Sequence, residues 1–281
     1  MKKSLQTELW KATHNRMFFV AILIGILLMV NDMFRVSGAM AEFLERVGED
    51  GMPGSPPSPH SADYYSFFVE VGMFNPFSTG AAAFHLVWPI LAAMPYADAY
   101  AQEHRTGISS QMIARTSTRA YFLSKYVAIF VTGGIAVTVP AVVDLLGCAL
   151  ISPTIKVAAN AVEVRNSYFL SRLFFTHPWG YAAAWIPIIF LWGGVTAGLA
   201  LLVGDRFRNK VFVLLFPFAV YCVLGLVYPL CSPTLQVVPL DMLRMMPDHP
   251  TSGVVIFGYA AVLMMTALFF GYRQVKRYEI L

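Results

Sequence analysis

Residues 98–125 read DAYAQEHRTGISSQMIARTSTRAYFLSK and form the longest polar, basic interruption between two apolar segments of the chain. Gly107 near its centre predicts the end of a helix that leaves an apolar segment, because glycine takes the left-handed cap without a Cβ penalty. After it, Ile108, Met112 and Ile113 recur among polar residues, which predicts a short amphipathic helix. Such a helix needs a surface to lie against, either the lipid headgroups or a soluble partner.

The composition indicates an integral membrane protein. Of the 281 residues, 57% are hydrophobic and 13% are charged, against roughly 25% charged residues in soluble domains. Several charge-free runs reach the length of about 18 residues or more that marks a transmembrane helix. We expect a single membrane domain over residues 1–281, with an all-α fold of six transmembrane helices. An N-terminal interfacial elbow helix and a short cytoplasmic coupling helix complete the expected fold.

The apolar runs predict where the spans lie. They cover about residues 17–38, 78–101, 121–146, 179–204, 211–232 and 251–272, with an interfacial helix at 2–16 and an outer polar region at 38–77. Pro89 and Pro95 imply kinks in the second span. Gly133-Gly134 in the third span, and a stripe of glycines from Gly193 to Gly198 in the fourth, allow close helix approach.

The distribution of charge predicts the orientation. Fourteen of the 20 Lys and Arg residues fall in the segments 1–16, 98–125, 205–210 and 273–281, which share one side if there are six spans. The other side carries 11 of the 16 acidic residues. Because basic loops stay in the cytoplasm, we expect a multi-pass protein of a bacterial-type plasma membrane with both termini cytoplasmic.

Among the titratable side chains in the predicted spans are Asp32, Arg35, His85 and Asp144. Ionisable groups at membrane depth face protein or a water-filled cavity, so we expect these four to line a substrate path. Asp32 and Arg35 are three residues apart and can pair on one helical face. The alternative for this pair is a place at the outer interface.

The chain lacks the common motifs of catalysis and cofactor binding. It has no Gly-x-x-x-x-Gly-Lys-Ser/Thr, no His-Glu-x-x-His and no cysteine or histidine cluster with zinc spacing. We therefore expect no catalytic residue, no metal and no cofactor in this chain. Cys148 and Cys231 permit an outer bridge, but three ordinary apolar cysteines fit better. Topology and membrane lipid account for the basic segments, so no nucleic acid partner is implied.

One pattern carries a resemblance. The segment after the second span follows Glu-x-x-x-Gly, a short helix, and Ser/Thr-Arg-x-Tyr-x-x-x-Lys, at Glu103, Gly107, Thr118, Arg119, Tyr121 and Lys125. Together with the layout of spans, this resembles the permeases of ABC-2 type transporters. The chain departs from that family at Thr116-Ser117, where proline is frequent, and at Ser124, where glycine is frequent.

The resemblance implies the membrane subunit of an ATP-driven ABC exporter. A separate ATPase subunit would bind ATP and Mg²⁺, and a second permease, either another copy or a sister chain, would complete the complex. The residues expected to couple the ATPase to the spans are Glu103, Arg105, Gly107, Ile108, Met112, Arg115 and Arg119. Spans rich in aromatic residues and methionine suit an apolar or amphipathic cargo, such as a peptide, a lipid or a hydrophobic drug.

Two other classes of function stay open. One is an intramembrane enzyme, a protease or a lipid-modifying enzyme, that uses His85, His177, Asp144 or Glu70. The other is a non-transporting membrane sensor or scaffold that binds a ligand through its outer region. An associated ATPase would favour transport, whereas activity of the single chain without ATP would favour the enzyme.

Overall fold

The structure is a computed structural model that describes residues 2–50, 71–73, 78–152, 169–204, 209–231, 239–245 and 252–277. In this part of the chain, helices are the only regular elements. Five helices are long and apolar enough to cross a membrane: α2 (Arg16–Asp50), α8 (Thr118–Ile151), α10 (Pro178–Leu199), α11 (Lys210–Cys231) and α12 (Gly253–Arg277). The expected all-α, multi-pass architecture is confirmed at this level.

The second predicted span, 78–101, is not one helix. It consists of α5 (Thr79–Ala93), a turn, and α6 (Ala99–Arg105). Pro95 lies in the turn, where its ring prevents a regular helix, and its carbonyl accepts a hydrogen bond from Asn15 Nδ2 at 2.8 Å. The predicted kink at Pro95 is thus a complete break, whereas Pro89 stays inside α5. Since α5 has only 15 residues, six spans remain a prediction.

Several helices extend beyond the predicted spans. α2 continues through Asp32 and Arg35 to Asp50, so the first part of the predicted outer polar region is helical. α8 begins at Thr118, because the Ser117 side chain caps it by accepting a hydrogen bond from the backbone N–H of Ala120. A short 3-10 helix, η1 (Ala200–Leu202), extends α10. The proline-rich stretch 51–60 and residues 205–208 lie outside the described residues.

The centre of the bundle is the crossing of α8 and α10, which is formed by small residues. A methyl group placed on Gly193 would lie 2.9 Å from the carbonyl oxygen of Gly133, closer than real Cβ atoms approach backbone. Gly198 likewise faces the ring of Tyr126. The close helix approach predicted at Gly133-Gly134 is confirmed, and its partner is the glycine stripe of α10, the most buried of the five long helices.

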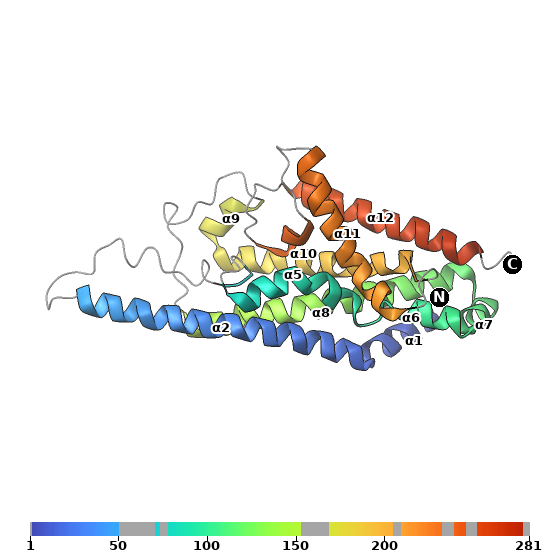
Figure 1. The fold of residues 1–281 in the computed structure, drawn as a ribbon, viewed down its shortest axis with the longest axis horizontal. Helices are drawn as coiled ribbons and strands as arrows, with labels where there is room; N and C mark the ends of the chain where they lie inside the picture. Colours follow the sequence, from blue (N-terminus) through green and yellow to red (C-terminus); the bar gives the residue numbers. More distant parts are fainter. Residues whose placement is uncertain are drawn as a thin grey trace.

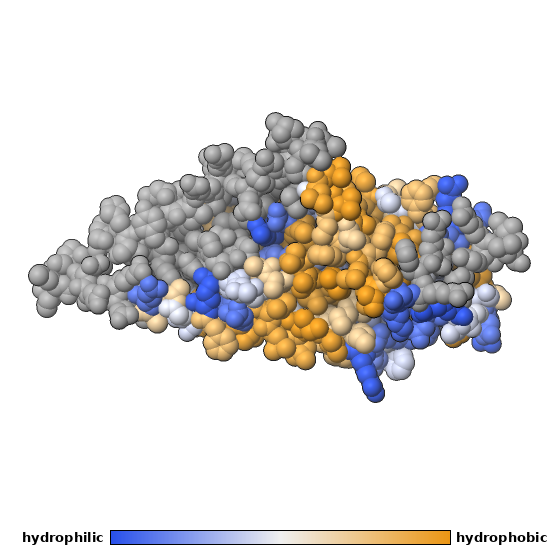
Figure 2. All heavy atoms as spheres, in the orientation of Figure 1, coloured by the Kyte–Doolittle hydropathy of each residue, from blue (hydrophilic) through white to orange (hydrophobic). Residues whose placement is uncertain are grey.

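The bundle is elongated and has two distinct ends (Figure 1). The helices α1 (Lys2–Thr13), α6 and α7 (Ile108–Arg115) gather at one end with the last turns of α12, and we call this the α7 end. The last turns of α2 and the short helix α9 (Ser171–Thr176) lie toward the other, which we call the far end. Hydrophobic side chains form a belt between hydrophilic surfaces in Figure 2, as a protein that spans a bilayer requires.

Candidate functional site

Lys125 is the centre of a buried polar group at the α7 end. It lies in the second turn of α8, and its side chain is only 1% exposed. Its ammonium nitrogen, Nζ, lies 2.5 Å from Glu8 Oε2 on α1 and 2.8 Å from Glu103 Oε1 on α6. A buried ammonium without such partners would be strongly destabilising, so the two carboxylates account for a lysine in an apolar bundle.

Two tyrosines complete the coordination of the carboxylates. Tyr96, in the turn between α5 and α6, donates to Glu8 Oε2 at 2.9 Å. Tyr121 on α8 donates to Glu103 Oε2 at 2.8 Å. The Lys125 ammonium also lies 4.9 Å from the centre of the Tyr96 ring, close enough for a cation–π attraction. Each carboxylate is therefore held by the Lys125 ammonium and by one phenol.

A second lysine makes the group electrically neutral. Lys11 on α1 lies 3.1 Å from Glu8 Oε1 and 3.6 Å from Glu103 Oε1. Burial opposes the ionisation of Glu8, but the charges of Lys125 and Lys11 and the hydrogen bond from Tyr96 outweigh it, so the pKa of Glu8 lies below its ordinary value. Burial also opposes the charge on Lys11, yet Glu8 and Glu103 raise its pKa. We call these six residues the Lys125 cluster: Glu8, Lys11, Tyr96, Glu103, Tyr121 and Lys125.

The cluster joins parts of the chain that are distant in sequence. It links α1, the break after α5, α6 and the start of α8, and Ser4 and Ser124 add a hydrogen bond of 3.0 Å between α1 and α8. Glu103 lies only four residues before Gly107, which takes the left-handed conformation with φ 73°. That predicted turn is confirmed. The turn between α6 and α7 is thus anchored to two helices, α1 and α8, through the Glu103 carboxylate.

Helix α7 presents one side to the bundle and another to solvent. Met112 and Ile113 pack against the core, as the predicted apolar stripe requires. Ile108 does not follow the prediction, since it is 43% exposed while its neighbour Ser109 is buried. The outer side of α7 is exposed at Ser110, Gln111, Ala114 and Arg115. This polar side is open to a partner.

The remaining residues expected in coupling lie on the surface near this turn. Arg105 donates from Nε to the carbonyl of Ala101 at 3.1 Å. Arg119 is exposed and donates from Nε to the hydroxyl of Tyr272 at 3.3 Å, which connects the start of α8 with α12. The structure therefore brings Glu103 into the Lys125 cluster and leaves Arg105, Arg115 and Arg119 at its periphery.

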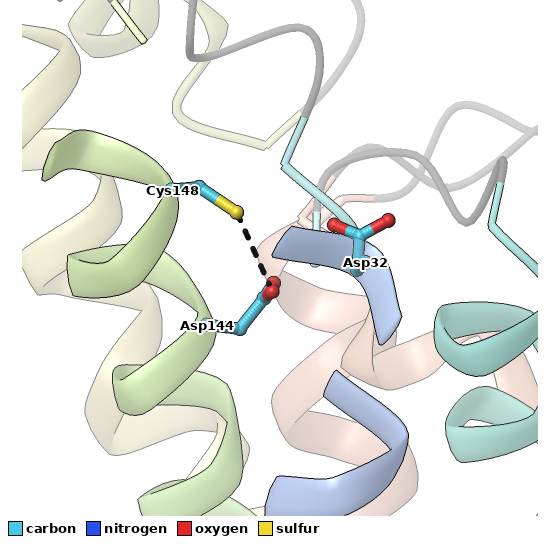
Figure 3. A group of neighbouring side chains, drawn as sticks. All are labelled: Asp32, Asp144 and Cys148. Carbon is cyan, nitrogen blue, oxygen red and sulfur yellow. Dashed lines mark hydrogen bonds between the residues drawn. The ribbon is translucent and has the colours of Figure 1, made fainter. Parts of the chain in front are cut away.

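The far end holds a second buried polar group, drawn in Figure 3. Asp144 and Cys148 extend from adjacent turns of α8 toward Asp32 on α2. Asp32 and Asp144 are fully buried. The Asp32 carboxylate accepts hydrogen bonds from Arg35 Nε at 3.2 Å and from the backbone N–H of Gly72 at 2.7 Å. The predicted pairing of Asp32 with Arg35 is confirmed.

His85 belongs to the same far-end group. Its Nε2 donates to the carbonyl of Gly72 at 3.1 Å. Its Nδ1 is buried and has no hydrogen-bond partner in the described part of the chain, which favours a neutral ring because a second N–H there would be unsatisfied. The four residues expected along a substrate path, Asp32, Arg35, His85 and Asp144, thus meet around residues 71–73. Cys148 joins them as a free thiol that donates to Asp144 Oδ1 at 3.6 Å. The side chain of Cys231, with which the sequence permits a bridge, lies outside the part that the structure describes.

The far-end group has donor types that also occur in metal sites. One donor atom each of Asp32, Asp144 and Cys148 lies within 4.8 Å of the other two. Both oxygens of Asp32, however, already accept N–H donors, and one of these belongs to a guanidinium cation. Because the arginine neutralises the carboxylate that a metal would need, we assign no metal to these residues.

Sequence reasoning missed Glu8 as a functional residue. It lies on the buried side of α1 beside Leu5 and Ala12, a position that an apolar residue normally fills. An acid within the apolar stripe of an amphipathic helix was the available signal, since it requires a buried cation. Lys125 provides that cation, and it too stands alone among apolar residues at the start of α8.

Comparison with known proteins does not assign the chain to a family. No known protein family and no curated protein sequence matches it. The basis for a functional assignment is therefore the geometry of the two polar groups together with the motif that surrounds Gly107.

Proposed function

We propose that the chain is the membrane-spanning permease subunit of an ATP-driven exporter of the ABC-2 type. The observation that carries this proposal is the contact among Glu103, Tyr121 and Lys125, three of the residues on which the resemblance rests. Glu103 lies before α7, whereas Tyr121 and Lys125 follow it one helical turn apart on α8, yet the Glu103 carboxylate binds both. A sequence pattern whose residues contact one another in the structure supports the assignment more strongly than a sequence match alone.

The junction suits the transmission of force from a cytoplasmic ATPase. A partner that docks on the exposed side of α7 pushes on the turn at Gly107, and the Lys125 cluster carries the movement to α1 and α8. ATP and Mg²⁺ bind on that separate subunit. Helix α7 then acts as the coupling helix and α1 as the interfacial elbow, with the α7 end and both termini in the cytoplasm.

The cargo that fits this subunit is apolar or amphipathic. Aromatic contacts run through the bundle, among them Trp88 with Tyr221 and Trp192 with Tyr259, while polar groups concentrate at the two ends. A second permease, another copy of this chain or a sister chain, completes the path with it. In this arrangement the far-end group of Asp32, Arg35, His85 and Asp144 lies at the outer exit.

The proposal is tested by the partners of the intact protein. The full-length chain is purified under mild detergent and its partners are identified by mass spectrometry. A matched preparation carries three substitutions on the exposed side of α7: Ser110→Glu, Gln111→Glu and Arg115→Glu. We expect a nucleotide-binding ATPase with the parent that is reduced or absent with the triple variant. If no ATPase accompanies the parent, or if its amount is the same in both preparations, the proposal is wrong.

A specific observation favours one other candidate. Two buried aspartates on neighbouring helices, Asp32 and Asp144, are the arrangement that activates water in aspartic proteases, where the carboxyls share one proton. Against this, each oxygen of Asp32 already accepts one N–H donor, from Arg35 or from the backbone of Gly72, which weakens it as a base for water. We therefore rank an intramembrane protease second, and ATP-independent peptide cleavage by the purified chain would establish it.

A further inference from the structure

The charges of the far-end group do not balance when both aspartates are ionised. Asp32 and Asp144 are fully buried, and Arg35 on α2 is the cation that binds this pair. Two carboxylates and one guanidinium leave one negative charge in a medium of low dielectric constant, which is costly. One added positive charge makes the group neutral.

The hydrogen bonds show which of the four carboxylate oxygens lacks a donor. Asp32 accepts an N–H donor at each oxygen, as an ionised carboxylate does. Asp144 receives the weak thiol donor of Cys148 at Oδ1, with the backbone N–H of Met73 nearby. Its other oxygen, Oδ2, is fully buried and has no hydrogen-bond partner in the described part of the chain. A bare carboxylate oxygen in this place is the unfavourable state, and a protonated one removes the charge.

We propose that Asp32 and Asp144 form a proton-binding site that holds one proton on Asp144. The step is the transfer of a proton from a hydronium ion of the solvent to Asp144 Oδ2. One O–H bond of hydronium breaks, an O–H bond forms on Asp144, and a water molecule is left, so the far-end group becomes neutral. Asp32 remains ionised because Arg35 and Gly72 stabilise its charge. This site does not depend on the direction or the cargo of transport.

A polar groove gives the site access to water. A cavity of about 420 Å³ is lined by Asn31, Phe34, Arg35, Ser78 and Thr79. The Arg35 side chain lines this groove and reaches Asp32 from it. The groove therefore brings water as far as Arg35, the direct partner of Asp32, while Asp32 and Asp144 themselves stay buried.

The proton on Asp144 determines how firmly residues 71–73 and 239–245 are held beside Asp32 and Asp144. Gly72 binds Asp32 through its N–H and His85 through its carbonyl, while the carbonyl of Met73 accepts from the N–H of Met245 at 2.9 Å. A second negative charge beside Asp32 would compete for Arg35 and for the Gly72 amide. Loss of the proton should therefore loosen residues 71–73 and the segment 239–245, which includes η2 (Pro239–Leu243).

Other charged groups near the pair are few in the described residues. Helix α5 contributes His85, which is bound to Gly72. The segment 239–245 contributes Asp241 and Arg244, which form an ion pair at 3.4 Å, and Arg244 also lies close enough to His85 to oppose a positive charge on its ring. Helix α8 adds the thiol of Cys148. A pH response of this region is therefore expected from the Asp32–Asp144 pair.

The test measures the protonated carboxyl directly. Infrared spectra of the purified full-length protein in nanodiscs are recorded near neutral pH, and the C=O stretch of a buried carboxylic acid is compared with variants. We expect this band in the parent and its loss in Asp144→Asn, an isosteric change that mimics the protonated acid. Asp32→Asn should also remove it, because Arg35 then pairs with an ionised Asp144. Cys148→Ser is the matched control and should keep the band at a shifted frequency, since a hydroxyl donates more strongly than a thiol.

A second measurement does not rely on the band. A proton bound in the folded protein and not in the unfolded chain makes stability fall as the pH rises. The thermal midpoint of the parent should therefore drop from neutral to alkaline pH, and Asp144→Asn should flatten that slope. Absence of the band in the parent, its survival in Asp144→Asn, or its survival in Asp32→Asn would overturn the proposal. So would a stoichiometric metal ion in the parent that Asp144→Asn removes.

Discussion

Lys125 Nζ on α8 lies 2.8 Å from Glu103 Oε1 on α6, although 22 residues and the whole of α7 separate the two in the chain. The same nitrogen binds Glu8 on α1 from its other side. One buried ammonium therefore fixes the start of α8 against both the N-terminal helix and the helix that leads into the Gly107 turn. Few surface ion pairs could do this, because solvent screens them.

The first prediction concerns Lys125→Met, which keeps much of the side-chain volume and removes the charge. Glu8 and Glu103 would then lose their central cation, so we expect a loss of about 3–5 kcal/mol in the free energy of unfolding. The matched control is Lys210→Met. Lys210 pairs with Asp98 at 3.2 Å but is 53% exposed, so its loss should cost less than about 1 kcal/mol. Denaturant unfolding in detergent checks both, and equal effects would contradict a special role of the cluster.

The second prediction tests the α8–α10 crossing with one added methyl group. In Gly193→Ala the new Cβ would lie 2.9 Å from the carbonyl of Gly133 and 3.1 Å from the Cα of Gly134. Since both contacts are backbone, the helices must separate, at a cost of about 1–3 kcal/mol. Gly180→Ala in the same helix is the control, because its nearest neighbour would be 3.6 Å away. A similar thermal midpoint for the two variants would show that the α8–α10 crossing accommodates an added methyl group.

Local rules predicted much of this fold. The left-handed Gly107 and the pairing of Asp32 with Arg35 follow from chain geometry over a few residues, and both are confirmed. Gly133-Gly134 predicted a close helix approach without naming the partner helix, which is α10. Helix ends were less predictable. α2 continues to Asp50 through polar sequence. The end of an apolar run does not end a helix, because the backbone hydrogen bonds can continue through polar residues.

The long-range contacts could not be read from the chain. No local pattern states that Glu8 meets Lys125, or that Cys148 and Asp144 face Asp32, because these contacts depend on how whole helices pack. The residue types gave partial signals: an acid on the apolar side of α1, a lysine at the start of a span, and an aspartate within α8. Each of these residues predicted that it has a charged or polar partner, but not which residue that partner is.

The third prediction concerns the pH dependence that Glu8 contributes. Its folded-state pKa lies below the ordinary value of 4.5, so its ion pairs stabilise the protein above that value and the contribution is lost as the pH falls through the lower, folded-state pKa. Glu8→Gln should reduce stability at neutral pH and flatten the acid side of the pH profile. Thermal midpoints measured from neutral to acidic pH check this. An unchanged acid slope in Glu8→Gln would assign the acid response to other carboxyls.

The fourth prediction tests the orientation in the membrane. Single cysteines replace Ser55 and Ser110 in a background without Cys148, Cys222 and Cys231. Ser110 is exposed on α7, whereas Ser55 lies in the predicted outer region and outside the described residues. A membrane-impermeant thiol reagent on intact cells should label the cysteine at position 55 and reach position 110 only after lysis. The reverse pattern, or labelling of both from outside, would refute a cytoplasmic α7 end.

The last prediction separates coupling from stability at the Gly107 turn. Gly107 has φ 73° and open space where a Cβ would lie, so Gly107→Val acts through the backbone and should cost at least about 1–2 kcal/mol locally. Gly38 also has open space but lies inside α2, where Gly38→Ala should be neutral or stabilising by up to about 1 kcal/mol.

The matched pair is compared in vesicles that contain the partner ATPase, as cargo exported per ATP hydrolysed. Glu103→Gln is added as a third variant, because glutamine can still accept the Tyr121 hydroxyl but no longer carries the charge that binds Lys125. If the turn transmits the ATPase movement, Gly107→Val and Glu103→Gln lower the ratio several-fold while Gly38→Ala keeps it. If all three variants keep the parental ratio and still bind the ATPase, force reaches the spans by another route, and the contact of Glu103 with Lys125 is a structural tie alone.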